Sequence, residues 1–310
     1  MNFAPIVLFV YNRLDHTKQV INALANNAFA QDSEFHIYSD AARDAEAKPQ
    51  VDEIRKYLAS VSGFKKVHIH LREQNLGVDA NVISGVTEII EVYGKVIVLE
   101  DDLVTSPWFL KYMNEALEFY EQEEEVISIH GYVYPVTQPL KEVFFLKGAD
   151  CWGWATWKGG WDLFEPDGKK LLDAIEQRGL GAAFDFNNTY PYLQALREQA
   201  AGETTCWDIR WYAAAFLGEK LTLYPGRSLV KNIGLDGTGT HCGDSSSHDV
   251  VLAATPVPIE TEILPDKTAY DAFADFFFQL SAADLPKKNI LSKAFRQIKS
   301  SIRAAFRVLM

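Results

Sequence analysis

The sequence contains little cysteine and no long apolar run. Only three of its 310 residues are cysteines, Cys151, Cys206 and Cys242, and their spacing matches no disulfide framework. An odd number of scattered cysteines favours free thiols in a reducing compartment. The apolar run at residues 6–10 is too short for a signal peptide or a membrane span, and no basic segment precedes it. We therefore expect a cytoplasmic protein.

The sequence is also poor in positive charge. It has 30 Lys and Arg against 42 Asp and Glu, which gives a formal net charge of −12. Proteins bind the phosphates of nucleic acids with clustered Lys and Arg side chains. An acidic chain of this kind is a poor nucleic-acid binder, so we expect no nucleic-acid partner.

The basic residues that are present gather near the end of the chain. Residues 286–310 contain no acid and seven basic side chains, Lys287, Lys288, Lys293, Arg296, Lys299, Arg303 and Arg307. Apolar residues recur there at helical spacing, at Leu291, Phe295, Ile298, Ile302, Phe306 and Leu309. A basic amphipathic helix is typical of an interfacial membrane anchor, which would place the protein at the inner face of the membrane. Packing of this helix on the body or on another subunit is the alternative.

The N-terminal third alternates strand-like and helical patterns. Four apolar segments, at residues 6–11, 35–39, 67–71 and 96–100, are separated by stretches with apolar residues at helical spacing. Such alternation predicts an α/β fold with a parallel sheet and helices on both faces. Right-handed connections place the four carboxyl ends at one edge, where open α/β sheets bind their ligands.

Polar side chains follow each of these four segments. In chain order they are Tyr11, Asn12 and Arg13, then Asp40, then Arg72 and Asn75, and finally the triplet Glu100-Asp101-Asp102. The same strand ends carry neither the GxGxxG nor the GxxxxGK[ST] phosphate-binding signature. A nucleotide at this edge would therefore be held by side chains and a metal.

The acidic triplet needs a compensating charge. Three consecutive carboxylates repel one another unless a cation lies between them. A divalent metal that also binds phosphate is the natural candidate, because hard cations select carboxylate oxygens. A solvated acidic turn is the alternative, although a single such turn would not require polar residues at the other three strand ends.

These motifs, taken in order, resemble those of GT-A glycosyltransferases. The pattern is closest to the N-acetylglucosaminyltransferase I family and the family-2-like bacterial enzymes near it. Glu100-Asp101-Asp102 matches their acidic triplet after an apolar strand, Gly153-Trp154 matches a later Gly-Trp motif, and Trp207-Asp208 matches a Trp-Asp motif. The resemblance covers roughly residues 4 to 245. One departure is that Ile209-Arg210-Trp211 replaces the Asp-Trp with which the family's Trp-Asp-Asp-Trp motif ends.

The resemblance implies a GT-A fold, which is a mixed, mostly parallel sheet flanked by helices. It implies one domain over residues 1–280, with a nucleotide-binding half at 1–105 and an acceptor half at 106–280. The implied activity is inverting, metal-dependent transfer of a sugar from a nucleotide donor, UDP-linked, to a glycan or lipid-linked acceptor. Synthesis of bacterial surface polysaccharide is the setting that the resemblance suggests.

Chemistry gives roles to the acidic residues. Asp102 is predicted to bind Mn²⁺ or Mg²⁺, with Glu100 and Asp101 on the donor ribose or on metal-bound waters. His241, in a loop rich in Gly, Ser and Thr, is a second and weaker metal candidate. Asp208 is predicted to be the base that deprotonates the acceptor hydroxyl. The alternative for Asp208 is a helix cap or an ion pair with Arg210.

The remaining predicted contacts involve the nucleoside and the acceptor. The resemblance places Asp40 on the uracil edge and Arg13 or Arg72 on a phosphate or the base, with Tyr11, Asn12 and Asn75 beside them. Each Arg could equally form a surface ion pair, and Asn75 could be a turn residue. Trp152 and Trp154 are predicted to line the acceptor site because sugars stack on aromatic rings, although core packing would explain either residue.

Two other functions are compatible with the sequence. A sugar nucleotidyltransferase also uses metal-bound carboxylates on a doubly wound sheet, but it would carry a Gly-rich basic loop where this chain has Asn12-Arg13-Leu14. The other rival is a non-catalytic module that binds a nucleotide or glycan.

Overall fold

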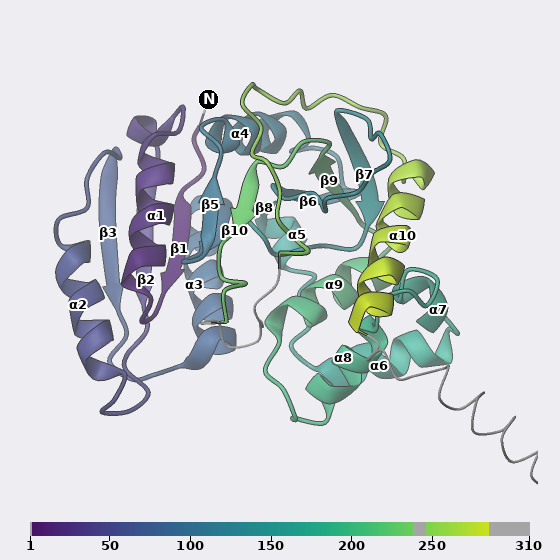
Figure 1. Cartoon of the computed structure of the whole chain (residues 1–310), viewed down its shortest axis with the longest axis horizontal. Coiled ribbons are helices and arrows are strands. Elements are labelled where there is room, and N and C mark those ends of the chain that lie inside the picture. Colours follow the sequence, from purple (N-terminus) through teal and green to yellow (C-terminus); the bar gives the residue numbers. More distant parts are fainter. Residues whose placement is uncertain (1, 238–245, 285–310) are drawn as a thin grey trace, which may run out of the picture.

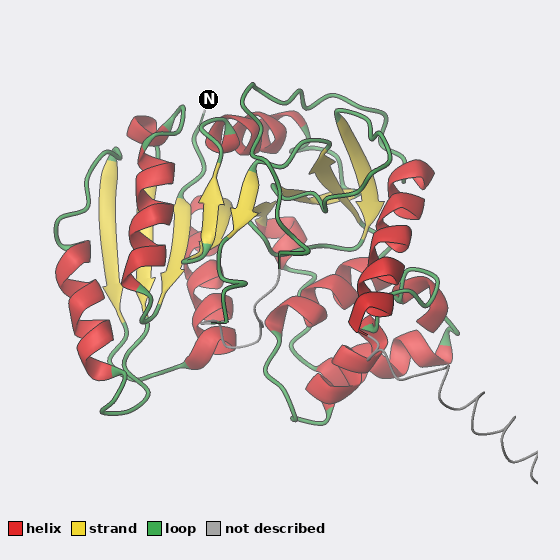
Figure 2. Cartoon of the chain, viewed as in Figure 1, coloured by secondary structure: helices red, strands yellow, loops and turns green. Residues whose placement is uncertain are grey.

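The computed structural model describes residues 2–237 and 246–284 of the chain. Eight strands form one sheet in the order β3-β2-β1-β4-β8-β6-β9-β7, and β5 pairs with β10 in a second, two-stranded sheet. The large sheet crosses the molecule and carries helices on its faces (Figures 1 and 2).

The first four strands of the sheet are parallel. They are β3 (Lys66–Leu71), β2 (Glu34–Ser39), β1 (Ile6–Val10) and β4 (Lys95–Glu100). Helices α1 (Leu14–Ala25) and α2 (Lys48–Leu58) share a core with one face, and α3 (Gly77–Tyr93) shares a core with the other. Burial on both faces explains why β1 and β4 are apolar throughout their length. The carboxyl ends of these strands meet at one edge.

The other half of the sheet is mixed. Strand β8 (Trp154–Trp157) is antiparallel to β4 and to β6 (Val126–His130), while β9 (Leu221–Pro225) is parallel to β6 and antiparallel to β7 (Val143–Lys147). In the small sheet, β5 (Leu103–Thr105) pairs with β10 (Val230–Asn232). Because β5 starts directly after the acidic triplet, this pairing brings residues near 233 to the same strand end.

The remaining helices complete both layers. They are η1 (Ala30–Asp32), α4 (Phe109–Phe119), α5 (Lys158–Trp161), α6 (Gly168–Gln177), α7 (Gly181–Phe184), α8 (Tyr192–Ala200), α9 (Trp207–Leu217) and α10 (Lys267–Asp284). Helix α10, yellow in Figure 1, lies beside β7. Its Phe273 packs edge-on against Phe144 and Tyr224 and closes an aromatic core between the sheet and α6–α9.

The predicted fold class, a mixed and mostly parallel sheet flanked by helices, is confirmed. The predicted basic helix at 286–310 lies outside the described residues. Within the described part of the chain, no helix combines the length and the apolar character that crossing a membrane requires.

Candidate functional site

Arg13 supplies the positive charge nearest to the acidic triplet. It follows β1, which is hydrogen-bonded to β4, so the side chain reaches the end of the neighbouring strand. Its Nη2 donates to the carboxylate of Asp101 and, at 2.8 Å, to Oδ2 of Asp102. Burial opposes charge on Arg13, but the two carboxylates outweigh it and raise the pKa of the guanidinium. Arg13 therefore stays protonated and holds two of the three acids together.

One arginine does not balance this cluster. Burial, and then the charges of Asp102, Asp208 and Asp101, raise the pKa of Glu100, which Arg13 only partly offsets. Burial also raises the pKa of Asp101, despite the opposing effect of Arg13. The strand end therefore has a deficit of positive charge that a proton or a metal ion would relieve.

The segment after β10 packs directly on Asp102. The backbone N–H of Ile233 donates to the Asp102 carbonyl oxygen at 2.8 Å. At Gly234, a Cβ atom would collide with the Asp102 carboxylate and would approach Nη1 of Arg13 to 2.9 Å. A glycine is therefore needed at this crossing. The chain then leads toward His241, which lies outside the described residues.

A cavity of about 250 Å³ opens at the strand ends, and we call it the strand-end cavity. Seven of the predicted donor residues line it: Tyr11, Asn12, Arg13, Asp40, Asn75, Glu100 and Asp101. Asp102 is not among the lining residues and is held beside them through Arg13. Arg43 also lines the cavity, and the sequence analysis missed it. Its backbone N–H donates to the Tyr11 hydroxyl at 3.1 Å, which places an exposed arginine at the mouth.

Asp40 has a structural task within this cavity. Its carboxylate accepts hydrogen bonds from the backbone N–H groups of Leu76 and Gly77, both at 2.9 Å, and from Nδ2 of Asn75 at 3.1 Å. These bonds tie the end of β2 to the loop that begins α3. Asp40 therefore orders one wall of the cavity, and a base contact would have to compete with these donors.

The structure corrects the prediction for Arg72. Its Nε donates to Oδ1 of Asn81 at 3.0 Å, and its two terminal nitrogens bind Glu88 at 3.0 Å and Ser84 at 2.9 Å. Its guanidinium also lies 4.8 Å from the ring centroid of Tyr38. Arg72 is thus committed to α3 and does not line the strand-end cavity.

A second cavity, of about 150 Å³, contains Asp208, and we call it the Asp208 cavity. It adjoins the first through consecutive residues, since Thr205 lines one cavity and Cys206 the other. The Asp208 side chain is exposed to the cavity, and desolvation by the surrounding protein raises its pKa from the ordinary Asp value, although hydrogen bonds from backbone N–H groups oppose the shift. A carboxylate with a raised pKa is a stronger base when ionised.

Asp208 is not paired with Arg210. Arg210 instead donates to Asp79 on α3 and, at 3.0 Å, to the carbonyl of Pro166. The ion-pair alternative for Asp208 is therefore wrong. The cap alternative stays open, because the Asp208 carboxylate interacts with the backbone N–H groups of Ile209 and of Asp208 itself in the first turn of α9, although Cys206 holds the cap position.

Asp150 and Cys151 share the Asp208 cavity, and neither was predicted. The thiol of Cys151 lies 4.0 Å from Oδ2 of Asp208. Oδ1 of Asp150 accepts from the Cys151 backbone N–H at 2.8 Å, and Oδ2 accepts from the Tyr134 hydroxyl at 3.3 Å. The position of Asp150, between the strand at 143–147 and the Trp-rich segment, is the only sequence signal that could have identified it.

The structure also corrects the prediction for Trp154. This residue is fully buried and stacks on Trp207, with Trp161 and Trp211 at its sides, so no face of its ring is open to a ligand. The stack instead fixes the start of α9, with Trp207 inside and Asp208 facing the cavity. Trp152 remains partly exposed and packs edge-on against Tyr132 and His248.

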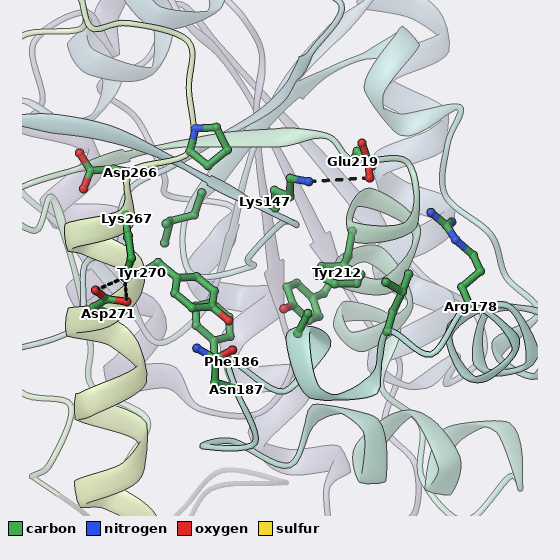
Figure 3. A pocket seen from close by; sticks show the side chains of 15 residues that line it. Lys147, Arg178, Phe186, Asn187, Tyr212, Glu219, Asp266, Lys267, Tyr270 and Asp271 are labelled. Carbon is green, nitrogen blue, oxygen red and sulfur yellow. Dashed lines mark hydrogen bonds and ion pairs between the residues drawn. The ribbon is translucent and has the colours of Figure 1, made fainter.

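A larger and more apolar cavity, of about 480 Å³, lies on the other side of Tyr212 (Figure 3). Phe186, Tyr212 and Tyr270 form its floor, and Lys147, paired with Glu219 at 3.8 Å, lies at its rim. It contains none of the predicted site residues, and Tyr212 is its link to the Asp208 cavity.

The donor atoms at the triplet fit a hard divalent cation. Oδ1 of Asp102 has no hydrogen-bond partner among residues 2–237 and 246–284, and the side chain is 18% exposed. The triplet offers carboxylate oxygens, which Mn²⁺ and Mg²⁺ accept. Asp102 would contribute one ligand, so phosphate and water oxygens would complete the shell.

The sequence matches no protein-family model and no curated protein. Three solved structures are similar to part of the fold. One is the mannosyltransferase PcManGT from Pyrobaculum calidifontis in complex with GDP-Man and Mn²⁺, with a TM-score of 0.39 and 9% identity over 70% of this chain and 69% of that chain. A second is a nucleotide-diphospho-sugar transferase candidate from Desulfovibrio desulfuricans G20. It has a TM-score of 0.35 and 14% identity, and the match covers 54% of this chain and 69% of that chain.

The third is S. aureus TarS, with a TM-score of 0.33 and 14% identity over 48% of this chain. This chain spans 28% of the length of TarS in that structure and 48% of a shorter form, TarS 1–349. Likenesses this distant do not show what the chain binds.

The raised pKa of Glu100 predicts a specific pH dependence of stability. Folded protein keeps the Glu100 proton to a higher pH than unfolded protein, so the free energy of unfolding falls as pH rises from the ordinary Glu range through the raised pKa. Denaturant titrations at mildly acidic and neutral pH should show that Glu100→Gln loses less stability than the wild type over this interval. Glu121→Gln, the same change at an exposed position, should follow the wild type. Parallel behaviour of all three proteins would contradict the electrostatic description.

Proposed function

We propose that this chain is an inverting, metal-dependent glycosyltransferase of the hexosyltransferase class. It would transfer a sugar from a nucleotide donor, UDP-linked, to a glycan or lipid-linked acceptor in the synthesis of a bacterial surface polysaccharide. The observation that carries this proposal is the pairing of two cavities at one sheet edge. One contains the acidic triplet with Arg13, and the adjoining one contains Asp208 with a raised pKa.

The strand-end cavity suits the nucleotide. Tyr11, Asn12 and Asn75 offer polar groups to a nucleoside, and Arg13 and Arg43 offer positive charge to a diphosphate. Nη1 of Arg13 is buried without a hydrogen-bond partner among the described residues, so a phosphate oxygen would satisfy it. When bound at Asp102, Mn²⁺ or Mg²⁺ would offset the charge of the leaving diphosphate.

Asp208 is then the base. Its carboxylate would accept the proton of the acceptor hydroxyl as that oxygen attacks the anomeric carbon and the bond to phosphate breaks. Attack on the face opposite to the nucleotide inverts the anomeric centre. The Trp154–Trp207 stack holds α9 so that Asp208 faces the cavity, while the Arg210–Asp79 pair keeps the only nearby arginine of α9 away from it.

The two rivals fit the site less well. A nucleotidyltransferase gains no support at the end of β1, where a single arginine is engaged by two carboxylates. A purely binding module would have no use for a carboxylate with a raised pKa in the second cavity.

Replacing the base tests catalysis directly. Asp208→Asn should lower kcat about 10²- to 10⁴-fold, the usual contribution of a general base, and should leave UDP affinity unchanged. Release of nucleoside diphosphate and calorimetric UDP binding measure the two quantities. Glu203→Gln, a neighbouring exposed acid, is the matched control and should retain activity. Full activity of Asp208→Asn would show that Asp208 is not the base.

Replacing the metal ligand tests the donor site. Mn²⁺ should strengthen UDP binding by wild-type protein, and Asp102→Ala should abolish that enhancement because it removes the exposed carboxylate at the strand end. Calorimetric titrations of UDP with and without Mn²⁺ measure this effect. Asp162→Ala, at an exposed position directly after α5, should behave as the wild type. An equal Mn²⁺ effect in Asp102→Ala would show that the metal assignment is wrong.

The same proposal places the protein at a membrane face through residues 286–310. The support is the sequence pattern alone, with seven basic residues and no acid along an apolar stripe. The full-length chain should co-sediment with anionic vesicles, less so at high salt and not with neutral vesicles. A variant with Lys287, Lys288 and Lys293 changed to Gln should lose most of this binding. Equal sedimentation with both vesicle types would contradict an electrostatic anchor.

A further inference from the structure

A cluster of imidazoles lies on the outer part of the sheet, away from both cavities. His36 lies on β2 and is directly opposite His68 on the edge strand β3, with His70 two residues further along. Glu34, at the start of β2, is on the same face because residues two apart in a strand share a face. Asp40 lies six residues beyond Glu34, about 20 Å along an extended strand, so the cluster is separate from the strand-end cavity.

Three of these side chains converge closely. Glu34, His36 and His68 each place one ligand atom within 4.8 Å of the other two, and among the described residues no other set of three His, Cys, Asp or Glu meets this condition. Nε2 of His68 lies 3.1 Å from Oε2 of Glu34. The rings of His36 and His68 stack nearly parallel, at 8°, with their centroids 4.2 Å apart, so one ring has to rotate for both to direct a nitrogen lone pair at a single ion.

One nitrogen in the cluster lacks a partner. His36 is only 4% exposed, and its Nε2 has no hydrogen-bond partner among the described residues. Its other nitrogen, Nδ1, lies 3.1 Å from Nε2 of His70. When Nδ1–H of His36 donates a hydrogen bond to His70, the lone pair on Nε2 is buried and has no donor from which to accept a hydrogen bond. An unsatisfied buried group lowers the stability of the fold, and a ligand at that nitrogen would remove this cost.

The surroundings suit a metal ion more than a hydrogen-bond donor. Burial, together with His68 and His70, lowers the pKa of His36 to about 4, so this imidazole is neutral and able to ligate at neutral pH. A hydrogen bond on the far nitrogen of a ligating histidine is the usual way to fix its tautomer and orientation, and His70 stands in that place. The hydroxyl of Tyr93 donates to Glu34 at 3.0 Å and orients that carboxylate in the same way.

We propose that Glu34, His36 and His68 form a transition-metal site that joins the edge strand β3 to β2. Two imidazoles and one carboxylate are a ligand set that Zn²⁺ accepts, with water in the fourth position. The side chains of His68 and Glu34 are 24% and 25% exposed, so an ion can enter from solvent. Lys65, 3.7 Å from Oε1 of Glu34 and largely exposed, is the nearby cation that would have to turn away.

Calorimetric titration of metal-free, full-length protein with Zn²⁺ tests this site. To separate it from the strand-end carboxylates, the titration uses Asp102→Ala protein alongside the wild type. Both should bind Zn²⁺ at this site with equal affinity, and both should gain several degrees in Tm because the ion binds only the folded chain. In either background, His68→Gln and Glu34→Gln should each weaken the binding at least about tenfold.

Two further variants separate ligation from general damage to the strand. His68→Cys supplies a thiolate in the same place and should retain binding, with Co²⁺ showing the visible absorption bands of a tetrahedral site. Lys65→Gln, beside Glu34 but not a ligand, should bind Zn²⁺ at least as tightly as the wild type. Absence of Zn²⁺ binding by Asp102→Ala protein, or binding unchanged by both His68→Gln and Glu34→Gln, would overturn the proposal.

Discussion

The site depends on one electrostatic arrangement, in which Arg13 bridges the carboxylates of Asp101 and Asp102 at the end of β4. Without a cation there, adjacent buried carboxylates would repel one another and the turn into β5 would be costly. Arg13 satisfies two of the three acids and leaves Glu100 with a raised pKa. The strand end is thereby stable in the folded chain and still short of positive charge, which is the condition for recruiting a metal ion; the charge of that ion would then attract a diphosphate.

The pairing of the strands fixes the positions of Arg13 and Asp102 relative to each other. Arg13 is next to the triplet because β1 and β4 are neighbours in a parallel sheet, and Asp102 is enclosed because β5 pairs with β10. Asp208 reaches the adjoining cavity because a stack of buried tryptophans fixes the first turn of α9. The proposed donor site and the proposed base thus lie on different segments, over a hundred residues apart, that one sheet edge brings together.

The spacing of apolar residues and the composition of the chain were enough to predict the parallel half of the sheet and the edge at which polar residues meet. They also located seven of the fifteen residues that line the strand-end cavity, because residues that follow parallel strands must lie at the carboxyl edge. Strand β8 was missed because its Trp-rich sequence suggested a ligand site, and Trp154 proved to be core. Arg72 was misassigned since only the folded chain shows its bonds to α3. Asp150 and Arg43 were missed because neither belongs to a motif.

The measurement that tests the central claim most directly is release of nucleoside diphosphate by the purified full-length protein. The protein would be incubated with Mn²⁺ and a panel of nucleotide sugars, with and without a mixture of glycan and lipid-linked acceptors. The account predicts metal-dependent release from at least one donor, with a uridine nucleotide as the product, and faster release when the acceptor is present. No release from any donor, with or without acceptor, would contradict it.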